Sequence, residues 1–207
     1  AVKKRLFARA ARSAVTVAED LAEQIEGQLQ RRCLALLGLA RRAGFFNALR
    51  ELDPKTERLL FLAGPGEFGR AGEEQPDSTL GRALLKAYDS LGYQGIYLAP
   101  ETANWLTGLK NPLPPEFISV GKVPEVRRER VSGLLVGVIF LPPLPSETEY
   151  PDDATLAAVR NAAASLREDT NLVIGVSPWG SKAERTFLEE EGAVFDLLLG
   201  AGFGGGN

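Results

Sequence analysis

The sequence of 207 residues contains no histidine, no methionine and a single cysteine, Cys33. Zinc, copper and non-haem iron sites depend mostly on imidazole and thiolate ligands, of which this chain has one thiol. General acid–base catalysis by histidine is excluded as well, and one cysteine cannot form an internal disulfide. These absences exclude many classes of enzyme before any motif is considered.

The chain also lacks an apolar run of the roughly 20 residues that a membrane-spanning helix needs, so we do not expect an integral membrane protein. Its formal net charge is −3, which argues against nucleic acid as the main partner because nucleic acids bind basic surfaces. A length of 207 residues with 44% hydrophobic residues suits one folded domain.

The N-terminal arm, residues 1–14, is rich in basic residues and has no acidic one. Such an arm is either a solvated segment or a peripheral contact to lipid or another polyanion. From Val17 to Leu37 apolar residues recur at every fourth position, which predicts a helix within residues 19–51. The residue before proline is driven out of the helical region, so this helix should end at Asp53-Pro54.

Beyond Pro54, short apolar runs alternate with amphipathic segments of helical period. This alternation predicts an α/β fold with a mostly parallel sheet and flanking helices. The run 134–141 is apolar throughout and should be buried on both faces, whereas 117–120 and 125–131 suggest strands of a more exposed, polar ribbon. Pro142, Pro143 and Pro145 predict a stiff, exposed connection. The other expected strands are 58–63, 95–99, 172–176 and 194–199, and the expected helices are 77–91, 101–109, 152–167 and 181–191.

Ligands of such sheets bind beyond the carboxyl ends of the strands. The segments that follow the predicted strands are 64–67, 99–102, 177–180 and 200–203, which consist largely of turn-forming residues. Two carboxylates, Glu67 and Glu101, lie among them, either as solvated loop residues or as cation or acid–base groups. A two-metal phosphoesterase needs several converging ligands, and these segments do not provide them.

Several segments resemble the catalytic domain of calcineurin-like metallophosphoesterases, specifically the 5'-nucleotidase branch. The resemblance extends over roughly residues 15–204 and implies a metallophosphoesterase-like α/β domain over 15–207. The family's domain continues with further strands, so the resemblance implies an incomplete sandwich whose edge is covered either by another chain or by further sequence of the same protein. The similar segments are 37–43, 60–65, 91–101, 131–141, 171–180 and 195–204.

The positions that match the family's metal ligands have mostly lost them. Proline and glycine cannot coordinate a cation through a side chain, so the resemblance implies a pseudoenzyme with no catalytic residue, metal or cofactor. Asp20 alone keeps a ligand-type match, in the least secure of the alignments. The degenerate positions are Asp20 and Ala22 for Asp-x-His, Pro65 for the bridging Asp, Pro100 and Glu101 for Asn-His, Pro178 for the His of Ser-His-x-Gly, and Gly202 and Gly204 for the last histidines.

Two functions from different classes follow. The first is a non-catalytic domain that serves as a structural or interaction subunit of a multi-subunit assembly, with protein partners. Trp105, Trp179 and Phe203 then form the interface, although core packing suits both tryptophans equally. The second is a phosphoester hydrolase that binds Mg²⁺ or Ca²⁺ through the oxygens of Asp20, Glu67 and Glu101.

The resembled family also implies an extracytoplasmic location, periplasmic or at the cell surface. Residues 36–44 additionally resemble the opening of a family of small ribosomal RNA-binding proteins. Nothing downstream continues that second match.

Overall fold

The computed structural model describes residues 38–52, 59–68, 78–110, 112–145 and 148–200. The chain divides into two compact units, Ala1–Leu52 and Asp53–Asn207. The described part of the first unit is one helix over residues 38–52, within which Leu39 and Phe46 are buried. The basic arm, the stripe from Val17 to Leu37 and the boundary between residues 14 and 15 lie outside the described residues.

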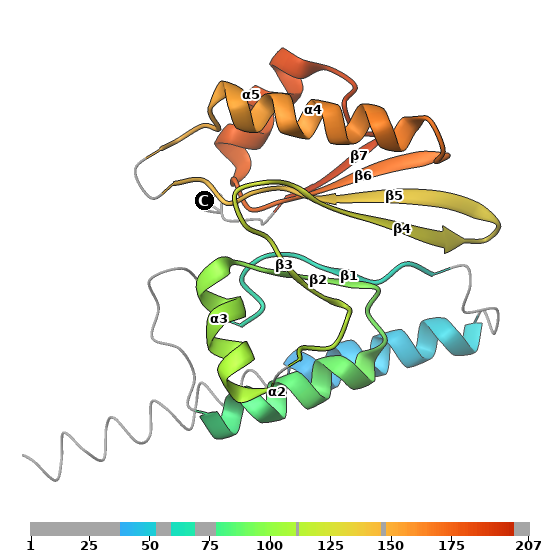
Figure 1. The fold of residues 1–207 in the computed structure, drawn as a ribbon. Helices are drawn as coiled ribbons and strands as arrows, with labels where there is room; N and C mark the ends of the chain where they lie inside the picture. The colour runs from blue at the N-terminus through green and yellow to red at the C-terminus, as the bar shows by residue number, and fades with distance from the viewer. Residues whose placement is uncertain (1–37, 53–58, 69–77, 111, 146–147, 201–207) are drawn as a thin grey trace, which may run out of the picture. The chain divides into compact units, whose positions relative to one another are not determined.

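The second unit has the α/β architecture that the sequence predicts, divided between two sheets (Figure 1). The first sheet has three parallel strands in the order β1-β2-β3, and the second has four in the order β4-β5-β6-β7. In the second sheet only the β4–β5 pair is antiparallel. The elements are β1 (Leu62–Ala63), α2 (Ser78–Leu91), β2 (Gly95–Leu98), α3 (Pro100–Leu109), β3 (Phe117–Ser119), β4 (Glu125–Val131), β5 (Leu134–Phe140), α4 (Asp153–Arg167), β6 (Leu172–Ser177), α5 (Ser181–Glu191) and β7 (Leu197–Gly200).

The expected exposed, polar ribbon is confirmed for residues 125–131, which are mostly exposed or half-buried, and is wrong for residues 117–120. β3 pairs with β2 in the first sheet and buries Phe117 and Ile118, because these side chains are apolar. β4 instead forms a hairpin with β5. Its turn is made by Ser132 and Gly133, whose φ values of 53° and 83° are those that a two-residue hairpin turn requires.

Alternating side chains of β5 enter two different cores. Val136, Val138 and Phe140 belong to a cluster that also contains Tyr97 and Ile118 of the first sheet. This cluster lies between the two sheets. The intervening Ile139 and the following Leu141 pack with residues of α4 and α5, which cover the other face of the second sheet (Figure 1). Burial on both faces, as predicted for 134–141, is therefore confirmed from Val136 onward.

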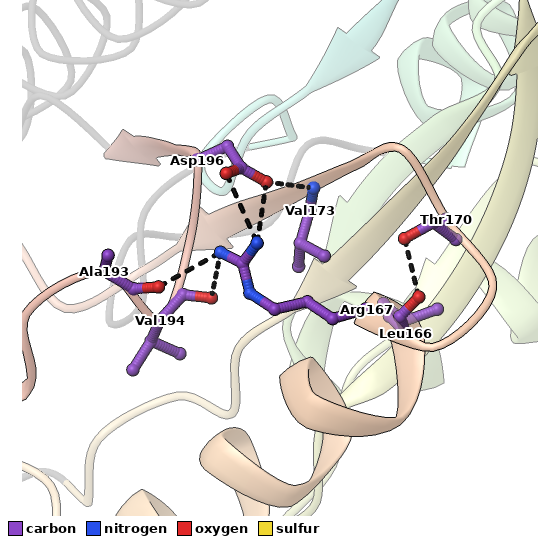
Figure 2. Close-up of polar contacts among 7 residues, drawn as sticks. All are labelled: Leu166, Arg167, Thr170, Val173, Ala193, Val194 and Asp196. Atoms are coloured by element: carbon purple, nitrogen blue, oxygen red, sulfur yellow. Dashed lines mark hydrogen bonds and ion pairs between the residues drawn. The ribbon is translucent and has the colours of Figure 1, made fainter.

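Polar contacts fix both ends of α4. At its start the Asp152 carboxylate accepts the Thr155 N–H at 2.8 Å, and this hydrogen bond lowers the pKa of Asp152. At its end Arg167 donates to the carboxylate of Asp196 and to the carbonyls of Ala193 and Val194 (Figure 2). Asp196 also accepts the N–H of Val173 at 2.7 Å. Arg167 thereby connects α4 to the segment that leads into β7.

Candidate functional site

The carboxyl ends of the parallel strands β2 and β5, one from each sheet, lie close together at one rim of the second unit. The hydroxyl of Tyr97, near the end of β2, donates to the carbonyl of Leu141, directly after β5, at 3.1 Å. Both residues are buried. The rim is therefore the place where the sequence expects ligands, and its residues can be considered together.

In the second sheet, Trp179 follows β6 and turns into the core. Its indole N–H donates to the carbonyl of Pro142 at 2.7 Å, and its ring packs edge-on against Phe187 with centroids 5.4 Å apart. The fully buried hydroxyl of Ser177 accepts the backbone N–H of Trp179 at 3.1 Å. Of the two roles considered for Trp179, the structure shows core packing.

The proline-rich connection after β5 differs from the stiff, exposed segment expected from the sequence. Pro142 is buried, Pro143 is half-buried, and Leu144 packs against the core cluster of the second sheet. Only Pro145 matches the expectation of exposure. The acceptor that Pro142 offers to Trp179 explains the difference, because a buried indole N–H requires a hydrogen-bond partner.

Glu184 of α5 also reaches this rim, and the sequence interpretation missed it. Its carboxylate accepts the N–H of Gly180 at 3.1 Å and lies so close to Gly200 that an added Cβ there would require the carboxylate to move. A carboxylate in the first turn stabilises a helix start. The glycine at position 180, followed four residues later by an acid, is the signal that would have identified this contact.

In the first sheet the degenerate positions follow β1 and β2. Pro65 lies in the turn after β1, and Pro100 is the first residue of α3. Glu101 is exposed in the first turn of α3. Burial, and secondarily the charge of Glu101, raise the pKa of Tyr97, so that its hydroxyl stays protonated and donates to Leu141.

Glu67 and Glu101 have different surroundings. The hydroxyl of Tyr88 in α2 donates a hydrogen bond to the Glu67 carboxylate, whereas Glu101 acts on the Tyr97 hydroxyl through its charge. Tyr88 belongs to an aromatic group with Phe68, whose ring centroid lies 4.9 Å away. The Glu67 carboxylate is thus bound to helix α2 through Tyr88.

Trp105 is another predicted site residue that the structure describes. Trp105 of α3 is half-buried and packs over Gly81 of α2, where an added Cβ would lie 2.6 Å from its ring. Asp20, Ala22, Gly202, Phe203 and Gly204 lie outside the described residues.

The donor set at the described part of the rim does not fit a two-cation centre. Pro65, Pro100 and Pro178 offer no side-chain ligand, and within the described ranges no three acidic or cysteine side chains converge as metal ligands. The described helices also include none that is long and apolar enough to cross a bilayer.

No protein-family model matches this chain, and no curated protein matches it. Among solved structures, the NAD nucleotidase NadN of Haemophilus influenzae is similar, with a TM-score of 0.53 and 18% sequence identity. The match covers 78% of this chain and 35% of that structure, so the chain spans about a third of the neighbour's length. At this identity the likeness concerns the fold alone.

Proposed function

We propose that this chain is a non-catalytic, 5'-nucleotidase-like domain that serves as a structural or interaction subunit of a larger assembly. The observation that carries the proposal is the composition of the rim. Pro65, Pro100 and Pro178 follow three strands at the positions where metal ligands would be needed. The rim of the second sheet is packed by the buried ring of Trp179 and its bond to Pro142.

In this proposal the binding partner of the domain is another protein. Trp105, which is half-buried, and Phe203 are the proposed interface aromatics, while Trp179 contributes to the core. We propose an extracytoplasmic location, periplasmic or at the cell surface, by analogy with the family that the sequence resembles. The basic arm of residues 1–14 would make a peripheral contact with lipid or another polyanion there.

Metal analysis combined with a phosphatase assay tests the loss of catalysis. Purified protein is analysed by mass spectrometry for bound metals and incubated with p-nitrophenyl phosphate or a 5'-nucleotide in the presence of Mg²⁺, Ca²⁺, Mn²⁺ or Zn²⁺. We expect metal far below one equivalent and no turnover above buffer. Stoichiometric metal together with turnover would refute the proposal.

The exposed carboxylate of Glu101 at the rim is the observation that favours the second candidate, a hydrolase that uses oxygen ligands only. The variant Glu101→Gln discriminates between the two, with Glu189→Gln on the exposed side of α5 as its matched control. Turnover that Glu101→Gln abolishes and Glu189→Gln leaves intact would support the hydrolase.

The assembly part of the proposal has its own test. Cross-linking in the native source, followed by identification of linked peptides, should give links from this chain to other proteins. Light scattering of the isolated chain gives its mass independently. A monomer without cross-linked partners in its native source would refute the assembly role while leaving the question of catalysis to the assay above.

A further inference from the structure

The edge strand β7 leaves one side of the second sheet open. It pairs with β6 in parallel, and within the described residues no further strand follows it in the sheet. The N–H of Asp196, directly before β7, donates to the carbonyl of Val173 in β6 at 2.9 Å. Because the backbone groups of successive strand residues point to opposite sides, the N–H and C=O groups of Leu197 and Leu199 point away from β6.

The side chains of β7 show which face of this edge is apolar and uncovered. Leu197 and Leu199 are 49% and 37% exposed, whereas the intervening Leu198 packs against the core cluster of α4 and α5. Leu197 lies opposite Ile174 and Leu199 opposite Val176, so both lie on the face that carries the cluster between the two sheets. Parallel sheets are normally covered on both faces, and an apolar edge favours pairing with another strand.

The opposite edge of the same sheet has a different character. β4 carries the exposed Arg127, Arg128 and Arg130 and the half-buried Glu129. Charged side chains on an edge strand oppose its pairing with further strands. The β4 edge of one copy therefore does not match the β7 edge of another, so head-to-tail growth of the sheet is disfavoured. An equivalent β7 is the edge that matches β7 in both backbone and side chains.

We propose that β7 is a homodimer interface, at which the β7 strands of two copies pair antiparallel about a two-fold axis beside Leu198. Leu197 of each copy then lies opposite Leu199 of the other. A two-fold contact of this kind is closed after one step and gives a dimer, not a fibre. The inference rests on the proposed assembly role and deepens it, since it names one partner as a second copy of this chain.

The register follows from the two properties of the edge. Residues opposite each other in an antiparallel pair place their side chains on the same face, so the axis lies beside a residue and not between two. At Leu198 it brings both exposed leucines of each copy onto those of the other. The outward N–H and C=O groups of Leu197 and Leu199 then bond to each other across the axis. Backbone pairing and apolar contact thus require the same arrangement.

Light scattering and sedimentation of the full chain across a dilution series test the dimer. The expected mass is twice the 22.3 kDa of one chain and falls to that of one chain on dilution. Leu197→Lys/Leu199→Lys and Leu197→Glu/Leu199→Glu each place like charges opposite one another, so each should raise the dissociation constant about tenfold or more. Mixing the two double variants should restore the dimer. Leu188→Lys changes a leucine of similar exposure on α5 and should dimerise like the wild type.

Amide hydrogen exchange followed by NMR locates the interface. The N–H groups of Leu197 and Leu199 should exchange slowly in the dimer and fast after dilution. The N–H of Leu198, which points towards β6, should be protected at every concentration and is the internal control.

A chain that is monomeric at every concentration would overturn the proposal, and so would a dimer in which Leu197 and Leu199 exchange as fast as in the charged variants. Slow exchange of both amides in a monomer would also overturn it, because another segment of the chain would then occupy the edge. In each of these cases, cross-links to other proteins in the native source would still support the wider assembly role, so the two proposals fail separately.

Discussion

The two halves of the second unit share one order of elements but are held together differently. The first half runs strand, helix, strand, helix, strand, with parallel strands that follow the chain order; the second repeats this order from β5 onward and adds the antiparallel strand β4 at its edge. In Figure 1, α2 and α3 lie along the first sheet, and α4 and α5 along the second. From β5 onward the two halves therefore share one topology and differ in the side chains that pack them.

The first half depends on the fit of aromatic rings. Tyr88 of α2 packs against Phe68 and Tyr93 with centroids 4.9 Å and 5.7 Å away, and Phe68 reaches Phe117 of β3 at 5.9 Å. Trp105 of α3 lies over Gly81 of α2. Aromatic packing of this kind is sensitive to shape and depends little on salt.

The second half combines a buried group of aromatic rings with side-chain hydrogen bonds and ion pairs near its surface. Phe187 lies between Trp179 and Phe195, with centroids 5.4 Å and 5.8 Å away. Around it, Arg160 donates to Glu191 at 2.8 Å and Arg167 to Asp196. The Tyr150 hydroxyl donates to Glu190 at 2.9 Å, and burial together with that carboxylate raises the pKa of Tyr150 to about 12. Loss of packing should damage both halves, whereas loss of side-chain hydrogen bonds should damage mainly the second.

The largest expected effect is that of Trp179→Ala. The change removes a buried ring beside Phe187 and leaves the carbonyl of Pro142 without its donor. We expect a loss of about 3–5 kcal/mol in the free energy of unfolding, the usual range for a buried large aromatic residue. Urea denaturation measures it.

Trp179→Phe separates packing from hydrogen bonding at the same position. It keeps most of the ring but not the indole N–H, so we expect a loss of about 1–3 kcal/mol, the cost of a buried unpaired carbonyl. Equal losses in the alanine and phenylalanine variants would show that the bond to Pro142 dominates. A loss below about 1 kcal/mol in the alanine variant would contradict the buried position of this ring.

The next largest effect is expected in the first half, at the contact between α2 and α3. At Gly81 an added Cβ would lie 2.6 Å from the Trp105 ring and 2.5 Å from Leu109, so Gly81→Leu should force α2 and α3 apart. We expect a loss of about 1–3 kcal/mol in thermal or urea unfolding, the usual cost of overpacking.

Gly108→Ala is the matched control, since this α3 glycine has open space around an added Cβ. The higher helix propensity of alanine should stabilise the protein there, by up to about 1 kcal/mol. If Gly81→Leu were neutral, the close contact between α2 and α3 would be refuted.

The halves also differ in how far the sequence predicts them. The helices Asp153–Arg167 and Ser181–Glu191 begin and end where they are expected, because Asp152, Gly180 and Gly192 define their ends locally. β3 pairs with β2 and does not form a ribbon with β4, as its sequence had suggested. This pairing depends on contacts between residues that are distant in the chain, which local patterns do not reveal. β1 spans only Leu62–Ala63: the Gln94 side chain binds the Phe61 N–H at 2.7 Å in place of a strand partner.

The same distinction applies to the candidate site. The positions of Pro65, Pro100 and Pro178 after their strands follow from local patterns, and the sequence predicts them well. The core role of Trp179 depends on Pro142, a contact that spans the connection and α4. Sequence patterns give the strand ends, whereas the contacts between them require the three-dimensional structure.

The smallest expected effect concerns Arg167, which connects α4 to the segment before β7 in the second half. Its guanidinium donates to Asp196 at 3.3 Å and 3.4 Å and to the carbonyls of Ala193 and Val194 at 3.0 Å and 3.1 Å (Figure 2). Arg167→Ala removes all of these bonds at a partly exposed site, so we expect a loss of about 1–2 kcal/mol in urea unfolding.

Arg167→Lys tests whether charge or geometry matters, because lysine keeps the charge but cannot reach several acceptors with one planar group. It should recover less than half of the loss. Arg128→Ala is the control: its pair with Asp169 at 2.9 Å is about half exposed, so its loss should stay within about 1 kcal/mol. If Arg167→Ala cost no more than Arg128→Ala, the perimeter bonds would be incidental, and both halves would depend on apolar packing alone.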